Sequence, residues 1–156
     1  MYDDILVRRG PASNVPPIIR EALAYWEGKL AGRSMPARRD FDPVFEIPDL
    51  LPWIMLVDVL RDPLDFRYRV IGMGIAERST RNYTGRRLSE LSHVTRTSPL
   101  WTDRQTVIET RAPKLTAPAY TGGSKTVQSV SGIHLPLSSD GETVDMIFTF
   151  VAYRTT

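Results

Sequence analysis

The sequence predicts an α+β fold of five strands and two main helices. Apolar side chains alternate with a period of two, as is typical of strands, in residues 53–60 and 66–72, and again from residue 115 onward. Apolar residues at spacings of three and four, typical of helices, occupy 14–32 and 98–112. Turn residues separate neighbouring strand segments, which favours hairpins and therefore antiparallel pairing.

The first helix has a clear beginning and end. Asn14, followed by Pro16 and Pro17, is typical of a helix start, and Gly32 ends the pattern. Its apolar stripe is the candidate contact with a second copy of the chain or with another partner protein, and docking onto its own domain is the alternative. The stripe consists of Ile19, Leu23, Trp26 and Leu30.

Residues 36–52 form a proline-rich connection, which we expect to be extended and stiff. Asp40 and Asp42 lie two apart within it and could share a divalent cation. We favour the alternative that Arg38, Arg39 and Asp40 tie the connection to the domain through bonds from side chains to the backbone. The connection is therefore a belt, and we expect no domain boundary in it.

The belt leads into a predicted hairpin, whose strands 53–60 and 66–72 are joined by Asp62-Pro63. Because side chains alternate along a strand, Phe66, Tyr68 and Val70 share one face, and this aromatic face is expected to be the core.

The second half of the chain contains the other helix and three strands. Ser98 and Pro99 form a cap and first-turn pair, and the helix must end by Pro113. Strands are predicted at 115–120, 125–137 and 143–153, separated by turns at 122–124 and 139–141.

Composition sets limits on the class of protein. A chain of 156 residues is the size of one domain, which we divide into a helical extension (1–35), the belt (36–52) and a core (53–154). The longest apolar run is too short to cross a membrane, and the N-terminus does not read as an export signal. The net charge of +2, with acidic residues interleaved, does not favour nucleic-acid binding.

Cysteine and histidine contents limit the possible cofactors. The absence of cysteine excludes disulfides and cysteine-ligated metals, and fits a cytoplasmic location. With only His93 and His134, a site built from several histidines is impossible, so we expect no metal site. The sequence requires no cofactor, and neither haem nor flavin is expected.

A set of short motifs gives the chain its family resemblance. They are Tyr25-Trp26, Arg39-Asp40-Phe41-Asp42-Pro43, the strand Leu51 to Asp58, Phe66-Arg67-Tyr68-Arg69, Thr84-Gly85-Arg86 and Asp140-Gly141-Glu142. With these motifs the chain resembles small bacterial single-domain PAS-like proteins over Ala22 to Tyr153. The resemblance implies one five-stranded antiparallel sheet with helices on one face, plus the extra N-terminal helix.

The PAS-like arrangement implies a pocket between the sheet and its helices, with few polar groups. Arg104 is the candidate for fixing a polar or anionic ligand, because it shares a helical stripe with Leu100 and Val107. The alternative is a solvated arginine paired with Asp103 or Glu109. The candidate lining residues are Tyr68, Val70, Tyr83, Trp101, Arg104, Met146, Phe148 and Phe150.

Three functions remain open at this point. The resemblance implies a non-catalytic sensory or regulatory module for signal transduction, which binds a small molecule, a signalling protein or both, as a homodimer. With no catalytic or DNA-binding segment attached, its output is expected to pass through association with another protein. The first alternative is a small ketosteroid-isomerase-like enzyme with Asp58 as base and Tyr68 as acid. The second is an adaptor without a ligand, which acts through the Trp26 stripe.

Overall fold

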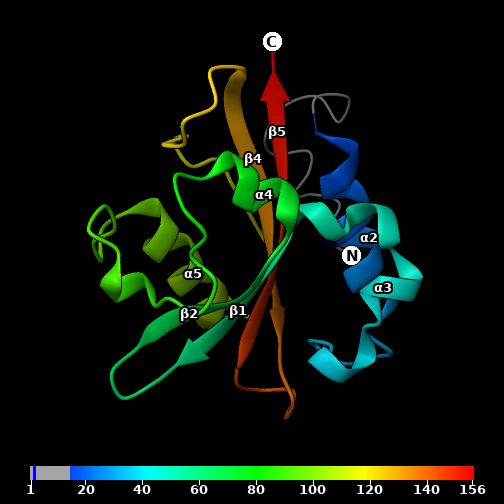
Figure 1. Ribbon diagram of the computed structural model, residues 1–156. Coiled ribbons are helices and arrows are strands. Elements are labelled where there is room, and N and C mark those ends of the chain that lie inside the picture. The colour runs from blue at the N-terminus through cyan, green and yellow to red at the C-terminus, as the bar shows by residue number, and fades with distance from the viewer. Residues whose placement is uncertain (1, 3–14) are drawn as a thin grey trace.

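The computed structural model describes Tyr2 and residues 15–156, so the helix start predicted at Asn14 lies outside the described residues. Figure 1 shows a central sheet with helices on both sides. In chain order the elements are α2 (Pro17–Gly28), η2 (Arg38–Asp40), α3 (Pro43–Glu46), η3 (Pro48–Trp53), β1 (Ile54–Leu60), β2 (Asp65–Ile71), α4 (Met73–Arg78), η4 (Leu88–Glu90), α5 (Pro99–Thr110), β3 (Lys114–Thr116), β4 (Val127–Leu137) and β5 (Met146–Thr155), where η marks a 3-10 helix.

The sheet has five strands in the order β2-β1-β5-β4-β3. Every neighbouring pair is antiparallel. The α+β class predicted from the sequence is therefore confirmed, and so are the β1–β2 hairpin and the helix α5. This strand order places the last strand, β5, in the centre of the sheet, where both of its faces are covered.

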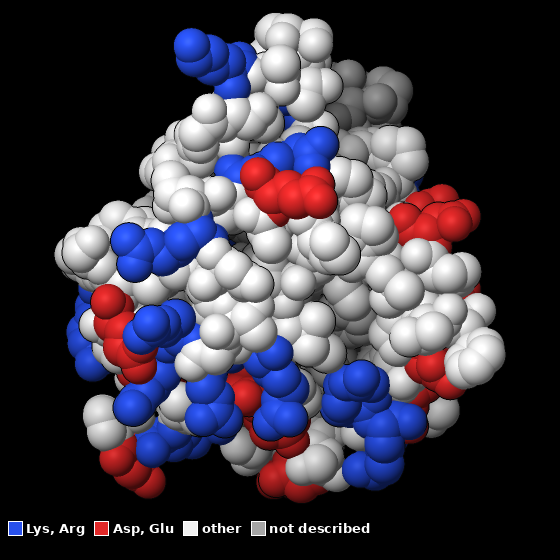
Figure 2. All heavy atoms as spheres, viewed as in Figure 1, with Lys and Arg blue, Asp and Glu red and all other residues white. Residues whose placement is uncertain are grey.

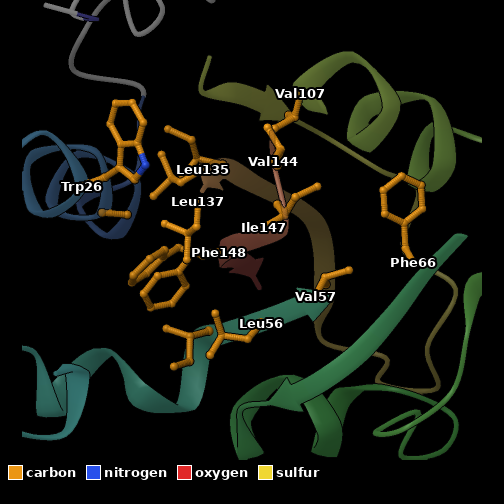
Figure 3. Close-up of a cluster of buried hydrophobic side chains, with 14 of the residues drawn as sticks. Trp26, Leu56, Val57, Phe66, Val107, Leu135, Leu137, Val144, Ile147 and Phe148 are labelled. Carbon is orange, nitrogen blue, oxygen red and sulfur yellow. The ribbon is translucent and has the colours of Figure 1, made fainter. Parts of the chain in front are cut away.

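The two faces of the sheet carry separate apolar layers, as Figure 3 shows for the labelled side chains. On the face that α2 covers, Phe148 lies with Leu135 and Leu56, its partners in β4 and β1. On the face that α5 covers, Ile147 lies with Val57. We call these the α2 face and the α5 face. Both layers exclude water, which supplies the main driving force for folding.

The helix α2 is fixed to its face by a specific bond as well as by packing. Three stripe residues, Ile19, Leu23 and Trp26, lie in α2, which packs against β4 and β5 and ends at Gly28, not at Gly32 as predicted. Leu30 follows the helix, and all four side chains are buried in the core. Within the same helix, Trp26 Nε1 donates a hydrogen bond of 2.8 Å to the backbone oxygen of Pro136 in β4. These four side chains are therefore used inside the protomer and are not exposed for contact with a second one.

The belt is not the extended connection that the prolines predicted, because it folds into the short helices η2, α3 and η3. Proline is tolerated at the first positions of a helix, and Pro43 and Pro48 occupy them here. The Asp40 carboxylate accepts bonds of 2.8 Å from the backbone nitrogen of Ala37 and from Arg33. Arg38 bonds to the backbone oxygen of Phe41. These bonds from side chains to the backbone lie within the belt, whereas we expected bonds from the belt to the rest of the domain.

The later strands also differ from their predicted bounds. The strand predicted at 115–120 is only Lys114–Thr116, and β4 begins at Val127. Residues 117–126 form an irregular segment instead of a tight hairpin, because Tyr120 turns back and donates a hydrogen bond of 2.6 Å to the backbone oxygen of Arg78. This segment forms one wall of the site described below.

Surface charge shows no single-sign field on the face in Figure 2, where basic side chains over the lower half alternate with acidic ones. Several of these charges form ion pairs, such as Arg86 and Arg87 with Glu90. None of the helices in the described part of the chain has the length and apolar character needed to cross a bilayer.

Candidate functional site

Two adjoining cavities lie on the α5 face of the sheet. The outer cavity has a volume of about 150 Å³ and lies between the sheet, α4 and the segment 117–122. The inner cavity has a volume of about 30 Å³ and lies between α5, β3, β4 and β5. Both are lined by Met55, Leu100, Pro118, Val130 and Val151, so the two chambers share a wall of apolar side chains.

The outer cavity is mainly aromatic and apolar. Tyr68, Tyr83, Tyr120 and Tyr153 line it together with aliphatic side chains. Tyr120 and Tyr153 meet edge to face with ring centroids 6.2 Å apart. Burial raises the pKa of Tyr153 to about 12, so its hydroxyl remains protonated at neutral pH.

The outer cavity also reaches the surface. Thr80 and Thr121 line it and are exposed, which leaves an opening between α4 and the segment 117–122. A small molecule could enter here without the sheet being opened.

The inner cavity contains Arg104, which is 0% exposed. Its Nη1 donates a hydrogen bond of 2.7 Å to the backbone oxygen of Leu100, one turn earlier in α5. Its Nε and Nη2 are buried and have no hydrogen-bond partner in the part of the chain that the structure describes. The guanidinium carbon lies 5.6 Å from the centre of the Tyr68 ring. The expected alternative, a solvated arginine paired with Asp103 or Glu109, is wrong, because the helical stripe turns this side chain toward the sheet.

His134 is the second polar residue of the inner cavity, and it is buried opposite Thr149 of β5. Its Nδ1 lies 2.7 Å from the Thr149 hydroxyl oxygen. Burial, and then the positive charges of Arg104 and Lys114, lower the pKa of His134 well below its usual value. The imidazole is therefore neutral at physiological pH.

Val70 does not line either cavity, contrary to the prediction, and is 39% exposed. The pairing of β1 with β2 contains a bulge, since Leu56 pairs with Val70 but Val57 pairs with Tyr68, which leaves Arg69 as the extra residue. A bulge reverses the alternation of faces beyond it. Ile71 consequently takes the place in the cavity wall that was expected for Val70.

Three residues of β5 that were predicted to line the pocket lie on the α2 face, away from the cavities. Phe148 and Phe150 belong to the α2 face, where Phe148 meets Phe41 with ring centroids 5.6 Å apart. Met146 pairs with Asp58 and Leu137 and lines neither cavity. Because successive side chains of a strand point to opposite faces, Thr149 and Val151 line the inner cavity instead.

Trp101 was also expected in the pocket but belongs to the core of α5. It is buried, and its ring meets Phe66 edge to face at a centroid distance of 5.2 Å. The guanidinium carbon of Arg96 also lies over this ring, 4.6 Å from its centre. Neither cavity includes it. Of the predicted lining residues, the structure therefore brings together Tyr68, Tyr83 and Arg104.

The pair Asp58 and Tyr68, expected in the enzyme alternative, does not form. Asp58 is 7% exposed, and its carboxylate accepts hydrogen bonds from Arg67, at 3.0 and 3.2 Å, and from Arg69, at 2.9 Å. Tyr68 pairs with Val57, the neighbour of Asp58, and so lies on the other face of the sheet. The Asp58 carboxylate is a structural ion-pair partner, and it lines neither cavity.

Several lining residues were missed by sequence reasoning. Met55 and Val151 line both chambers, and Tyr120 and Tyr153 line the outer one. Every second residue of β5 faces the same side, so Val151 and Tyr153 could be identified once one cavity residue of that strand was known. No sequence signal identifies Tyr120, because its segment has no regular structure.

The comparisons with known proteins give one match. A family profile described as PAS domain matches residues 15–152. No curated protein and no solved structure is similar enough to the chain to count as a match.

Proposed function

Since the chain belongs to the PAS domain family, we propose that it is a non-catalytic sensory or regulatory module that binds a small molecule in the two chambers on the α5 face. The observation that carries this proposal is the aromatic outer cavity of about 150 Å³, which adjoins a smaller one lined by Arg104 and His134 among apolar side chains. Sites for small molecules are typically concave and mostly apolar, with a few convergent polar groups.

The arrangement of the two faces supports this assignment. On the α2 face the side chains Trp26, Phe41, Phe148 and Phe150 are all buried in the core cluster. On the α5 face the cavities remain open between the sheet and its helices. A ligand can therefore be exchanged on one face while the packed layer on the other maintains the fold.

The output of this module is proposed to pass through a protein contact, either a homodimer or a signalling protein. The α2 stripe is buried, so such a contact must use other side chains. Among the described residues, the exposed large apolar ones are Val44 and Phe45 on α3, Met73 on α4, and Val70. Figure 1 shows α3 and α4 on the outside of the molecule.

Native mass spectrometry of the freshly purified protein tests the proposal, because one spectrum reports the number of subunits and any retained small molecule. We expect a stoichiometric adduct. The variant Val151→Phe fills the wall shared by the chambers and should abolish the adduct. The variant Val44→Phe makes the same change at an exposed position and should retain it.

Circular dichroism and the melting temperature establish that both variants are folded. If the wild-type protein shows no adduct and small molecules cause no change in its melting temperature, the chambers are not a binding site. If the adduct persists in Val151→Phe, the ligand binds elsewhere. The first outcome makes the adaptor function the better explanation, and the second rules out the chambers as the binding site.

A further inference from the structure

The guanidinium group of Arg104 is a buried cation with no counterion among the described residues. Arginine remains charged in proteins, and a buried charge is normally paired. Among the residues that the structure describes, no carboxylate forms an ion pair with Arg104. The Tyr68 ring gives only a cation–π contact.

The neighbours of Arg104 do not supply the missing negative charge. His134 is neutral and bonds to Thr149. Thr116, which also lines the inner cavity, donates its hydroxyl proton to Asp103 at 2.5 Å. Asp103 in turn lies 3.9 Å from the cation of Lys114. The inner cavity therefore lies beside a positive charge that these neighbours do not neutralise.

The two unpartnered nitrogens of Arg104 are suited to a carboxylate. Nε and Nη2 lie on one edge of the planar guanidinium, so two parallel N–H groups can meet the two oxygens of a carboxylate. The same chain uses this edge elsewhere, where Nε and Nη2 of Arg67 both donate to one oxygen, Oδ2, of Asp58. At Arg104 the corresponding edge is buried without a partner.

We propose that the site takes a small monocarboxylic acid, whose carboxylate is bound by Nε and Nη2 of Arg104 in the inner cavity and whose apolar body occupies the outer cavity. This inference rests on the proposed function, since it names the class of ligand for the same chambers. An inner volume of about 30 Å³ with one uncompensated cation fits a single carboxylate group.

The outer cavity sets the size of the ligand's body. A dry protein cavity of about 150 Å³ can hold a benzene ring, and the outer cavity has about this volume. Its tyrosine rings offer edge-to-face contacts to an aromatic group. Aryl carboxylic acids with a short linker are therefore the class with the best fit.

Phenylacetate is the first probe, and its uncharged isostere phenylacetamide is the matched control. Isothermal titration calorimetry on the wild-type protein should show binding of phenylacetate and binding at least about tenfold weaker for phenylacetamide, since a hydrogen bond to a charged group carries that much discrimination. Benzoate with benzamide and hexanoate with hexanamide extend the series to shorter and non-aromatic bodies.

Two variants locate the charge that binds the acid. Arg104→Met keeps the length of the side chain and should lose the preference for acid over amide. Arg61→Met removes the same charge from an exposed position in the β1–β2 turn and should bind like the wild type. The comparison of acid with amide on the wild-type protein needs no variant, so the test holds even if Arg104→Met does not fold.

The possible outcomes separate this inference from the proposed function. If acids and amides bind equally, or if Arg104→Met keeps the preference for acids, the chambers bind a ligand but the carboxylate assignment is wrong. If no acid binds but neutral compounds do, the carboxylate assignment is also wrong. If nothing binds and a crystal structure shows only water on Arg104, both proposals are wrong.

Discussion

Trp26 in α2 and Pro136 in β4 are 110 positions apart in sequence and are joined by a buried hydrogen bond of 2.8 Å from the indole Nε1 to the backbone oxygen. The bond fixes the N-terminal helix on the α2 face. An aromatic side chain with a polar group normally places that group on a partner when it is buried. The Trp26 indole thus both fills space in the core and attaches the helix to the sheet.

Replacing Trp26 with Phe should destabilise the protein by about 1–3 kcal/mol through the backbone oxygen left buried without its donor, in addition to any loss of packing. Urea unfolding measures the change. The control Trp53→Phe acts at a partly buried ring that contacts Tyr153 and Arg78 and should cost less. Equal losses in the two variants would mean that the hydrogen bond contributes nothing measurable.

The bulge at Arg69 predicts different effects for two adjacent substitutions. Ile71→Trp should fill the outer cavity and prevent ligand binding, because Ile71 forms part of its wall. Val70→Trp should leave binding unchanged, because Val70 is exposed. Binding of the purified protein's own ligand, followed by native mass spectrometry, distinguishes the two. The reverse result would show that β2 alternates regularly without a bulge.

The pKa of His134 predicts a loss of stability at mildly acid pH. In the folded protein this pKa is far below its usual value of 6.5, so the unfolded chain takes up the proton first. The contribution of neutral His134 to the free energy of unfolding is therefore complete above pH 6.5 and is lost as the pH falls. The slope should approach about 1.4 kcal/mol per pH unit for this one proton.

Urea unfolding between pH 7 and pH 5 tests this prediction. His134→Gln should give a flatter pH dependence, and the control His93→Gln, at an exposed position, should keep the wild-type slope. The carboxylates of Glu46 and Asp140 have pKa values of about 2, and their contribution is lost only at lower pH. A wild-type slope that His134→Gln leaves unchanged would contradict the prediction.

The unpaired charge of Arg104 predicts a stabilising substitution. Without a ligand, Arg104→Met should be as stable as the wild type or more stable by about 1–4 kcal/mol, because an apolar side chain avoids burying a charge. The measurement is urea unfolding of protein refolded from denaturant, which removes bound ligand. A clear loss of stability, absent in Arg61→Met, would mean that the protein itself supplies a partner for the guanidinium.

The fold could be predicted from the sequence because its signals are local. Ser98 and Pro99 start α5 as expected, and the Asp62-Pro63 turn joins β1 to β2. Arg104 could be identified because spacings of three and four along a helix place it with Leu100 and Val107. These features depend on near neighbours in the chain, where sequence patterns are most informative.

The remaining errors have physical causes that the sequence does not display. In β5 both faces are apolar and buried, so alternation could not distinguish Phe148 from Val151. In β2 nothing in the residue types signals the extra position at Arg69. In the belt, proline is compatible with an extended chain and with the first turn of a helix, and the structure uses it in the second way.

The extra residue in β2 has a consequence for how this chain can vary. Because Arg69 is the extra residue, its removal would leave the pairing of Tyr68 and Ile71 with β1 unchanged, and Ile71 would stay in the cavity wall. A deletion in the regularly paired part of the strand, at Arg67, would instead shift the side chains by one position and exchange their faces. The bulge can therefore absorb the loss of one residue. A deletion at position 69 should leave ligand selectivity unchanged, and a deletion at position 67 should change it.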